Sequence, residues 1–190
     1  MPRIFSAIEL PDDLREELYR LHQPLPGARW VHPGNYHISL RYLGDIDRSA
    51  AREFIENLAG LEPDPFELRM VGLGVFGGYD PHAVWASVEP SSALTALARA
   101  HEKAARLAGF APEKRPFTPH VTLARLRNSD TQRVARFLTR YGGYRSHPFL
   151  VTRTVVMSSR PVTGGGPYAV EDIFPMRGCG FAYEDQDISW

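Results

Sequence analysis

The chain of 190 residues has little cysteine, no net charge and no long hydrophobic run, and each absence excludes a class of protein. Its single cysteine, Cys179, cannot form a disulfide within the chain and fits a reducing compartment. No apolar stretch approaches the roughly 20 residues that a membrane-spanning helix needs. The opening sequence, MPRIFSAIEL, lacks the basic start and apolar centre of a secretion signal, so we expect a cytoplasmic protein.

Basic and acidic residues balance at 22 each. A protein that coats long nucleic acids usually carries an excess of basic residues, so the balance argues against such a coat. It does not argue against an enzyme that handles one phosphate at an RNA end, because a few local arginines suffice for that task. Apolar residues make up 43% and charged residues 23%, which excludes a disordered or fibrous chain.

Strand-like and helix-like segments are interspersed along the whole chain. Alternating β-branched and aromatic residues predict strands, whereas leucine and alanine at helical spacing predict helices. We expect strands near residues 3–8, 36–43, 66–75, 83–88, 121–124, 149–157 and 168–174, and helices near residues 11–21, 51–58, 94–107 and 134–138. No linker longer than a few residues separates them. The pattern indicates an α+β fold.

A short internal repeat contains two of the histidines. The sequences HISL, which begins at His37, and HVTL, which begins at His120, share the order histidine, apolar residue, hydroxyl residue, leucine. Side chains alternate between the two faces of a strand, so His37 shares a face with Ser39, and His120 shares a face with Thr122. If a pseudo-twofold axis relates the two copies, both pairs converge on one cleft.

Two imidazoles and two hydroxyls suit the hydrolysis of a cyclic phosphodiester. One histidine can take a proton from water while the other protonates the leaving oxygen, because the unperturbed pKa of histidine lies near neutral pH. Ser39 and Thr122 can donate hydrogen bonds to the non-bridging phosphate oxygens. The seven histidines include no His-x-His or His-x-x-x-His pair, and Cys179 has no partner, so we expect neither a metal nor another cofactor.

The paired motif resembles the two-histidine (2H) phosphoesterases, and within them the RNA 2',3'-cyclic phosphodiesterases, also called 2'-5' RNA ligases. That family carries histidine, apolar residue, threonine or serine, apolar residue, twice. The flanks are similar as well: RIFSAI resembles the first strand of the family, LGD follows the first motif, and PFTP precedes the second. The resemblance covers nearly the whole chain.

The resemblance implies a single bilobal domain over residues 1–190, with two pseudo-symmetric lobes, each an antiparallel sheet with helices, around a central cleft. It implies metal-independent hydrolysis of RNA 2',3'-cyclic phosphate ends to 2'-phosphates, with His37 as the proton donor and His120 as the proton acceptor. The residues alone leave these two roles open, because the half-motifs are nearly symmetric. The reverse reaction would join RNA ends through a 2'-5' linkage. We expect a monomer that needs no protein partner and no membrane.

Three arginines are candidates for contacts to the substrate. Alternation puts Arg41 on the face of His37. Arg125 matches a recurrent position of the family, but strict alternation puts it on the face opposite to His120, so it reaches the cleft only if the strand ends or bulges there. Arg160 lies beside the glycine-rich loop at residues 164–166. For each of the three, an exposed arginine paired with a carboxylate is the alternative.

Other residues have simpler interpretations, and two further functions stay open. We interpret Phe76, Tyr79 and Trp85 as core aromatics rather than as a platform for an RNA base. The remaining histidines are interpreted as structural or surface residues: His22, His32, His82, His101 and His147. The alternative functions are hydrolysis of a small cyclic or 2'-5' linked nucleotide, and non-catalytic binding of RNA or a nucleotide by the same fold.

Overall fold

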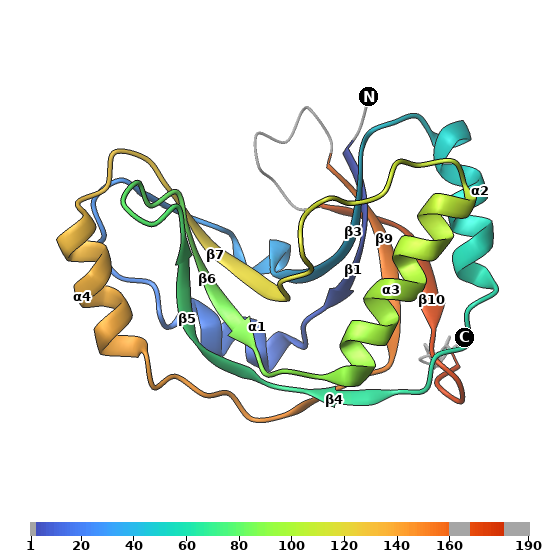
Figure 1. Ribbon diagram of the computed structural model, residues 1–190. Coiled ribbons are helices and arrows are strands. Elements are labelled where there is room, and N and C mark those ends of the chain that lie inside the picture. The colour runs from blue at the N-terminus through green and yellow to red at the C-terminus, as the bar shows by residue number, and fades with distance from the viewer. Residues whose placement is uncertain (1–2, 160–167, 181–190) are drawn as a thin grey trace, which may run out of the picture.

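The computed structural model describes residues 3–159 and 168–180, and its strands form two four-stranded antiparallel sheets (Figure 1). The sheet of the first lobe has the order β10 (Ala169–Pro175), β9 (Arg153–Ser159), β1 (Arg3–Glu9), β3 (His37–Asp45). The sheet of the second lobe has the order β2 (Ala28–Trp30), β7 (His120–Leu126), β6 (Ala83–Val88), β5 (Met70–Phe76). In a separate two-stranded sheet, β4 (Phe66–Leu68) pairs with β8 (Phe149–Val151).

Helices accompany both sheets. In Figure 1, α2 (Arg48–Ala59) and α3 (Ser92–Leu107) lie with the first lobe on the right, and α4 (Thr131–Tyr141) lies with the second lobe on the left. The helix α1 (Asp12–Tyr19) lies between the lobes, and a short 3-10 helix, η1 (Pro33–Asn35), leads into β3. The prediction of an α+β fold with two lobes, each an antiparallel sheet with helices, is therefore confirmed.

Three of these helices begin where a polar side chain caps them. The side chains of Asp47, Ser91 and Asp130 accept hydrogen bonds from backbone N–H groups in the first turns of α2, α3 and α4. Such caps satisfy backbone donors that have no partner inside the helix. They explain why these helices start at these residues and not earlier.

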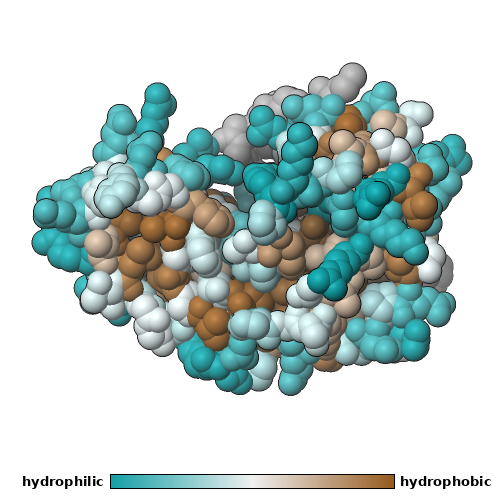
Figure 2. Space-filling view, in the orientation of Figure 1, coloured by the Kyte–Doolittle hydropathy of each residue, from teal (hydrophilic) through white to brown (hydrophobic). Residues whose placement is uncertain are grey.

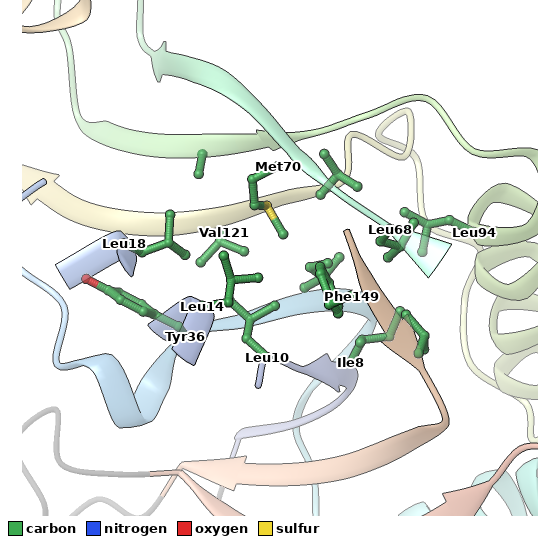
Figure 3. Close-up of a cluster of buried hydrophobic side chains, with 14 of the residues drawn as sticks. Ile8, Leu10, Leu14, Leu18, Tyr36, Leu68, Met70, Leu94, Val121 and Phe149 are labelled. Carbon is green, nitrogen blue, oxygen red and sulfur yellow. The ribbon is translucent and has the colours of Figure 1, made fainter. Parts of the chain in front are cut away.

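The largest buried cluster joins the two lobes (Figure 3). Ile8 and Ile38 come from the first lobe, Val121 comes from the second, and Leu14 and Leu94 come from α1 and α3. Both sheets are thus supported by one continuous apolar interior. This shared core favours the expected single domain over residues 1–190, which stays a prediction.

Two of the expected strands are each broken at one residue. The segment 66–75 forms β4 and β5 with Arg69 between them, and the segment 149–157 forms β8 and β9 with Thr152 between them. The carbonyls of both residues accept hydrogen bonds of 2.8 Å from outside these strands, from Glu89 and Met176. The short first halves therefore pair with each other instead of extending the main sheets. The strand β2 was not expected from the sequence.

The surface of the molecule is mixed in character. Figure 2 shows hydrophilic residues around the rim of one face and a band of hydrophobic residues across its middle. Within the described residues, no helix combines the length and the apolar character that crossing a membrane requires.

Candidate active site

The first motif lies on β3, and this strand contains a bulge. Ser39 and Arg41 pair with consecutive residues of β1, so Leu40 between them is an extra residue. An extra residue reverses the alternation of faces along the strand. His37 and Ser39 therefore share a face, as expected, but Arg41 does not share it.

Arg41 lies on the opposite side of the sheet, against α3. Its side chain is 7% exposed, and its Nε lies 2.5 Å from Oε2 of Glu102. Its Nη2 donates to the carbonyl of Ala111 at 2.5 Å. Ser6, the partner of Arg41 on β1, also bonds α3, through His101 at 2.9 Å. The expectation that Arg41 shares the face of His37 is wrong, because the bulge at Leu40 turns its side chain away.

The second motif lies on β7, where the bulge recurs at the corresponding position. Thr122 and Ala124 pair with consecutive residues of β6, so Leu123 is the extra residue. Here the reversal turns Arg125 to the face of His120 and Thr122, where it is exposed. Alternation alone would have put Arg125 on the opposite face. We call the face of the two sheets that carries His37, Ser39, His120, Thr122 and Arg125 the motif face.

Both imidazoles are held by a backbone carbonyl two residues earlier in the chain. Nδ1 of His37 lies 2.7 Å from the carbonyl oxygen of Asn35, and Nδ1 of His120 lies 2.6 Å from that of Thr118. A carbonyl only accepts hydrogen bonds, so each Nδ1 carries a proton and donates it. In both rings Nε2 is left as the nitrogen that can exchange a proton with a substrate.

Aromatic rings pack closely around His37. The ring centroids of Phe5 and Tyr168 lie 4.9 and 5.4 Å from that of the imidazole. The side chain of Asn35 accepts a hydrogen bond of 2.9 Å from the backbone N–H of Tyr168, so Asn35 fixes both the imidazole and one of its neighbours. Oγ of Ser39 lies 3.1 Å from Nε2 and donates to its lone pair.

The surroundings of His37 set its charge. Burial lowers the pKa of His37 to about 4, while the hydrogen bond to the Asn35 carbonyl acts in the opposite direction. The positive charges of His120 and Arg125 contribute to the same lowering of the pKa. Two groups of the second lobe therefore lie within electrostatic reach of a histidine of the first lobe. The imidazole of His37 is neutral at pH 7 in the free protein.

Two aromatic residues of the second lobe pack around His120 in the same manner. The centroids of Phe76 and Trp85 lie 5.0 and 5.8 Å from that of the imidazole. Gly74 leaves space for this arrangement, because a Cβ there would lie 2.3 Å from Cζ2 of Trp85. The interpretation of these aromatics as core residues is wrong: Phe76 and Trp85 are partly buried beside His120, and Tyr79 is fully exposed.

The remaining candidates from the sequence lie away from the two motifs or outside the described residues. Arg160 and the glycine-rich loop at 164–166 lie outside the described residues. His22 bonds the hydroxyl of Tyr36 at 2.6 Å, and His147 is paired with carboxylates. In residues 3–159 and 168–180, no three His, Cys, Asp or Glu side chains gather as metal ligands would.

Sequence analysis missed the groups that orient the two imidazoles. Asn35 and Thr118 act through backbone carbonyls, which have no side-chain signature. Phe5 comes from β1 and Tyr168 directly precedes β10, and both are distant from the motif in the chain. The one available signal was position: both carbonyls lie two residues before the histidine of their motif.

Comparisons with known proteins agree with the motifs. The family model of the 2'-5' RNA ligase superfamily matches residues 10–162. An RNA 2',3'-cyclic phosphodiesterase of Aquifex aeolicus is 32% identical over 156 residues, which cover 80% of this chain and 83% of that protein. One of Bacillus subtilis is 36% identical over 131 residues, 65% of this chain and 71% of that protein. One of Geobacillus stearothermophilus is 34% identical over 128 residues, but the match spans only 41% of that protein.

Solved structures share the fold at lower identity. The crystal structure of TT0787 of Thermus thermophilus has a TM-score of 0.76 at 23% identity and covers 93% of this chain and 98% of that chain. That of Escherichia coli LigT complexed with 3'-AMP has the same TM-score and identity, with 93% and 99% covered. The family match over residues 10–162 and the relative that is 32% identical along 80% of the chain show that this protein belongs to the 2'-5' RNA ligase superfamily.

Proposed function

We propose that this protein hydrolyses the 2',3'-cyclic phosphate at an RNA end to a 2'-phosphate, with His37 as the proton donor and His120 as the proton acceptor. The observation that carries the proposal is the matched pair of imidazoles, each fixed through Nδ1 by a carbonyl and each with Nε2 left for proton transfer. Relatives named RNA 2',3'-cyclic phosphodiesterase, at 32% and 36% identity, support the choice of substrate.

The proposed reaction consumes one water and needs two proton transfers. Nε2 of His120 accepts a proton as the water oxygen forms a bond to phosphorus. The bond from phosphorus to the 3'-oxygen breaks, and Nε2 of His37 gives its proton to that oxygen. Each transfer contributes roughly two to four powers of ten in rate. The two histidines finish with exchanged protonation states and return to their starting states through solvent.

Neighbouring donors would hold the negative charge of the phosphate. Thr122 and Arg125 lie on the motif face beside His120 and can donate to the non-bridging oxygens. In the free protein the hydroxyl of Ser39 bonds Nε2 of His37, so we expect it to rotate towards a phosphate oxygen when substrate binds. Arg160 stays a predicted contact. No metal or other cofactor takes part in the proposed steps.

A small cyclic phosphodiester or a 2'-5' linked nucleotide is the second candidate substrate. The absence of net charge is compatible with it, since only one phosphate must then be bound. Joining RNA ends through a 2'-5' linkage would use the same groups in reverse, but the abundance of water favours hydrolysis. A cytoplasmic monomer without an obligatory protein partner completes the proposal.

The test uses an RNA oligonucleotide that ends in a 2',3'-cyclic phosphate, incubated with the protein in EDTA. We expect a product whose phosphate resists a 3'-specific phosphatase, and we expect no product from His37→Ala or His120→Ala. His147→Ala is the control, because this histidine is half-exposed and paired with Asp13 and Glu17.

Each outcome has a distinct meaning. A folded protein that leaves the RNA end intact but opens a cyclic mononucleotide would point to the second candidate. Binding of RNA without turnover, unchanged in His37→Ala, would point to a non-catalytic module. Activity that EDTA abolishes and one added metal restores would contradict the metal-free mechanism.

A further inference from the structure

Two arginines on neighbouring strands, and a third directly after the end of one of these strands, gather on the motif face of the second lobe. Arg29 of β2 pairs directly with Arg125 of β7, and directly opposite residues of an antiparallel pair point to the same side. The backbone N–H of Arg127 bonds the carbonyl of Gly27 at 2.9 Å, so the pairing continues past the end of β7. Alternation then returns Arg127 to the side of Arg125. We call these three exposed residues the arginine row.

The opposite face of the two strands is occupied by the core. Ala28 and Trp30, which flank Arg29, pack with the buried cluster that contains Val134 and Phe137 of α4. Alternation therefore leaves the motif face as the only side to which Arg29 can point.

The arginine row concentrates positive charge in a chain whose formal net charge is zero. Arg29 lies directly opposite Arg125 on the neighbouring strand, so two positively charged side chains lie next to each other on the motif face. Over residues 3–159 and 168–180, no carboxylate forms an ion pair with Arg125 or Arg127. The exposed guanidinium groups of Arg125 and Arg127 are thus available for phosphate.

From this arrangement we infer that Arg29 and Arg127 bind the phosphates of the nucleotides that precede the cyclic end. The inference rests on the proposed function, in which Arg125 serves the reacting phosphate. Residues two apart on a strand lie about 7 Å from each other, which is comparable with the separation of neighbouring phosphates in an extended RNA strand. A cyclic mononucleotide has no such upstream phosphate. Arg29 and Arg127 therefore make a polynucleotide end a better substrate than a mononucleotide.

The test compares two substrates that share the same terminal nucleotide: 2',3'-cyclic AMP, and a short oligoadenylate that ends in a 2',3'-cyclic phosphate. The double variant Arg29→Gln/Arg127→Gln should lower kcat/KM roughly tenfold on the oligoadenylate and leave it unchanged on cyclic AMP. The slope of log kcat/KM against log salt for the oligoadenylate should become shallower by about 1.4, which is about 0.7 for each lost phosphate contact on a single strand.

A matched control removes the same charge elsewhere. Arg99→Gln/Arg136→Gln changes two exposed arginines on α3 and α4, away from the motif face. This control should not alter the rate on either substrate. An equal fall on both substrates in the Arg29/Arg127 variant, an unchanged rate on the oligoadenylate, or the same fall in the control would each overturn the inference. Thermal unfolding of each variant separates these results from a loss of fold.

Direct binding keeps the inference testable if the proposed function fails. If the wild-type protein cleaves neither substrate, the affinity for a fluorescein-labelled oligoadenylate with a 2'-phosphate end is measured by anisotropy. Weaker binding by the Arg29/Arg127 variant, but not by the control, supports the arginine row as an RNA-binding surface. Equal affinities for all three proteins overturn it.

Discussion

The proposed donor role of His37 requires that substrate binding raise its pKa. In the free protein burial holds this pKa at about 4, and Arg125 contributes to the lowering. At pH 7 only about one molecule in a thousand then carries the second proton on His37. Protonating half of the bound molecules requires a rise of about three pKa units, or roughly 4 kcal/mol. One anionic charge about 4 Å from the ring supplies roughly that energy at an effective dielectric constant near 20.

A histidine NMR titration with 2'-AMP, the mononucleotide product, measures this rise. We expect the His37 ring to titrate near pH 4 in the free protein and near neutral pH when 2'-AMP is bound. In free Arg125→Gln the pKa should lie above that of the wild type, because one repelling charge is gone. His101 is the internal control: burial also lowers its pKa to about 4, but it bonds Ser6 against α3 and should not respond to ligand.

Two results would refute this reasoning. A His37 that titrates near its usual value in the free protein would mean that the ring is not buried as described. A His37 whose pKa stays near 4 in the complex could not donate a proton at neutral pH, and the donor role would then pass to His120.

The remaining predictions concern stability. Gly74→Ala should lower the free energy of unfolding in urea by about 1–3 kcal/mol and change the fluorescence of Trp85. Gly143→Ala is the control and should do neither, because a Cβ at Gly143 has open space around it. Equal losses of stability in both variants would contradict the packing argument. The pKa of His101 is lower in the folded state than in the unfolded state. Its contribution to the free energy of unfolding is therefore complete above about pH 6.5 and is lost as the pH falls towards 4. His101→Gln should remove up to about 3 kcal/mol of this pH dependence of stability. If the stability of the variant depends on pH as that of the wild type does, the assignment to His101 is wrong. Asp130→Ala should lower the free energy of unfolding by roughly 0.5–2 kcal/mol, because α4 loses its cap. Asp130→Asn should lower it much less, because asparagine can also cap the helix. A similar loss of stability in both variants would show that the carboxylate charge matters and the cap does not.

Periodicity in the sequence was sufficient to predict most elements but not their breaks. The strand at 83–88 and the helix that ends at Leu107 follow directly from apolar spacing. Arg69 and Thr152 interrupt longer runs without any glycine or proline to mark the change. Those breaks arise because β4 and β8 pair with each other, which is a contact distant in sequence.

The two motifs were visible in the sequence, but the direction of the arginines was not. Strict alternation of side chains predicts the wrong face of the strand for Arg41 and for Arg125, because it allows for no bulge in either strand. The bulges at Leu40 and Leu123 depend on pairing with β1 and β6, and a leucine in a strand gives no sign of them. Side-chain direction beyond the motif thus needed the fold, whereas the choice of His37 and His120 as candidates needed only the sequence.

The shared core makes the spacing of the two imidazoles a property of the whole interior. Ile38 and Val121 directly follow the two motif histidines, and both are fully buried in the cluster that joins the lobes. Each motif thus contributes one residue to the surface and the next residue to a common anchor. The relative position of the two histidines therefore depends on the packing of this shared cluster. Heat that loosens this anchor should therefore release both histidines in a single cooperative transition.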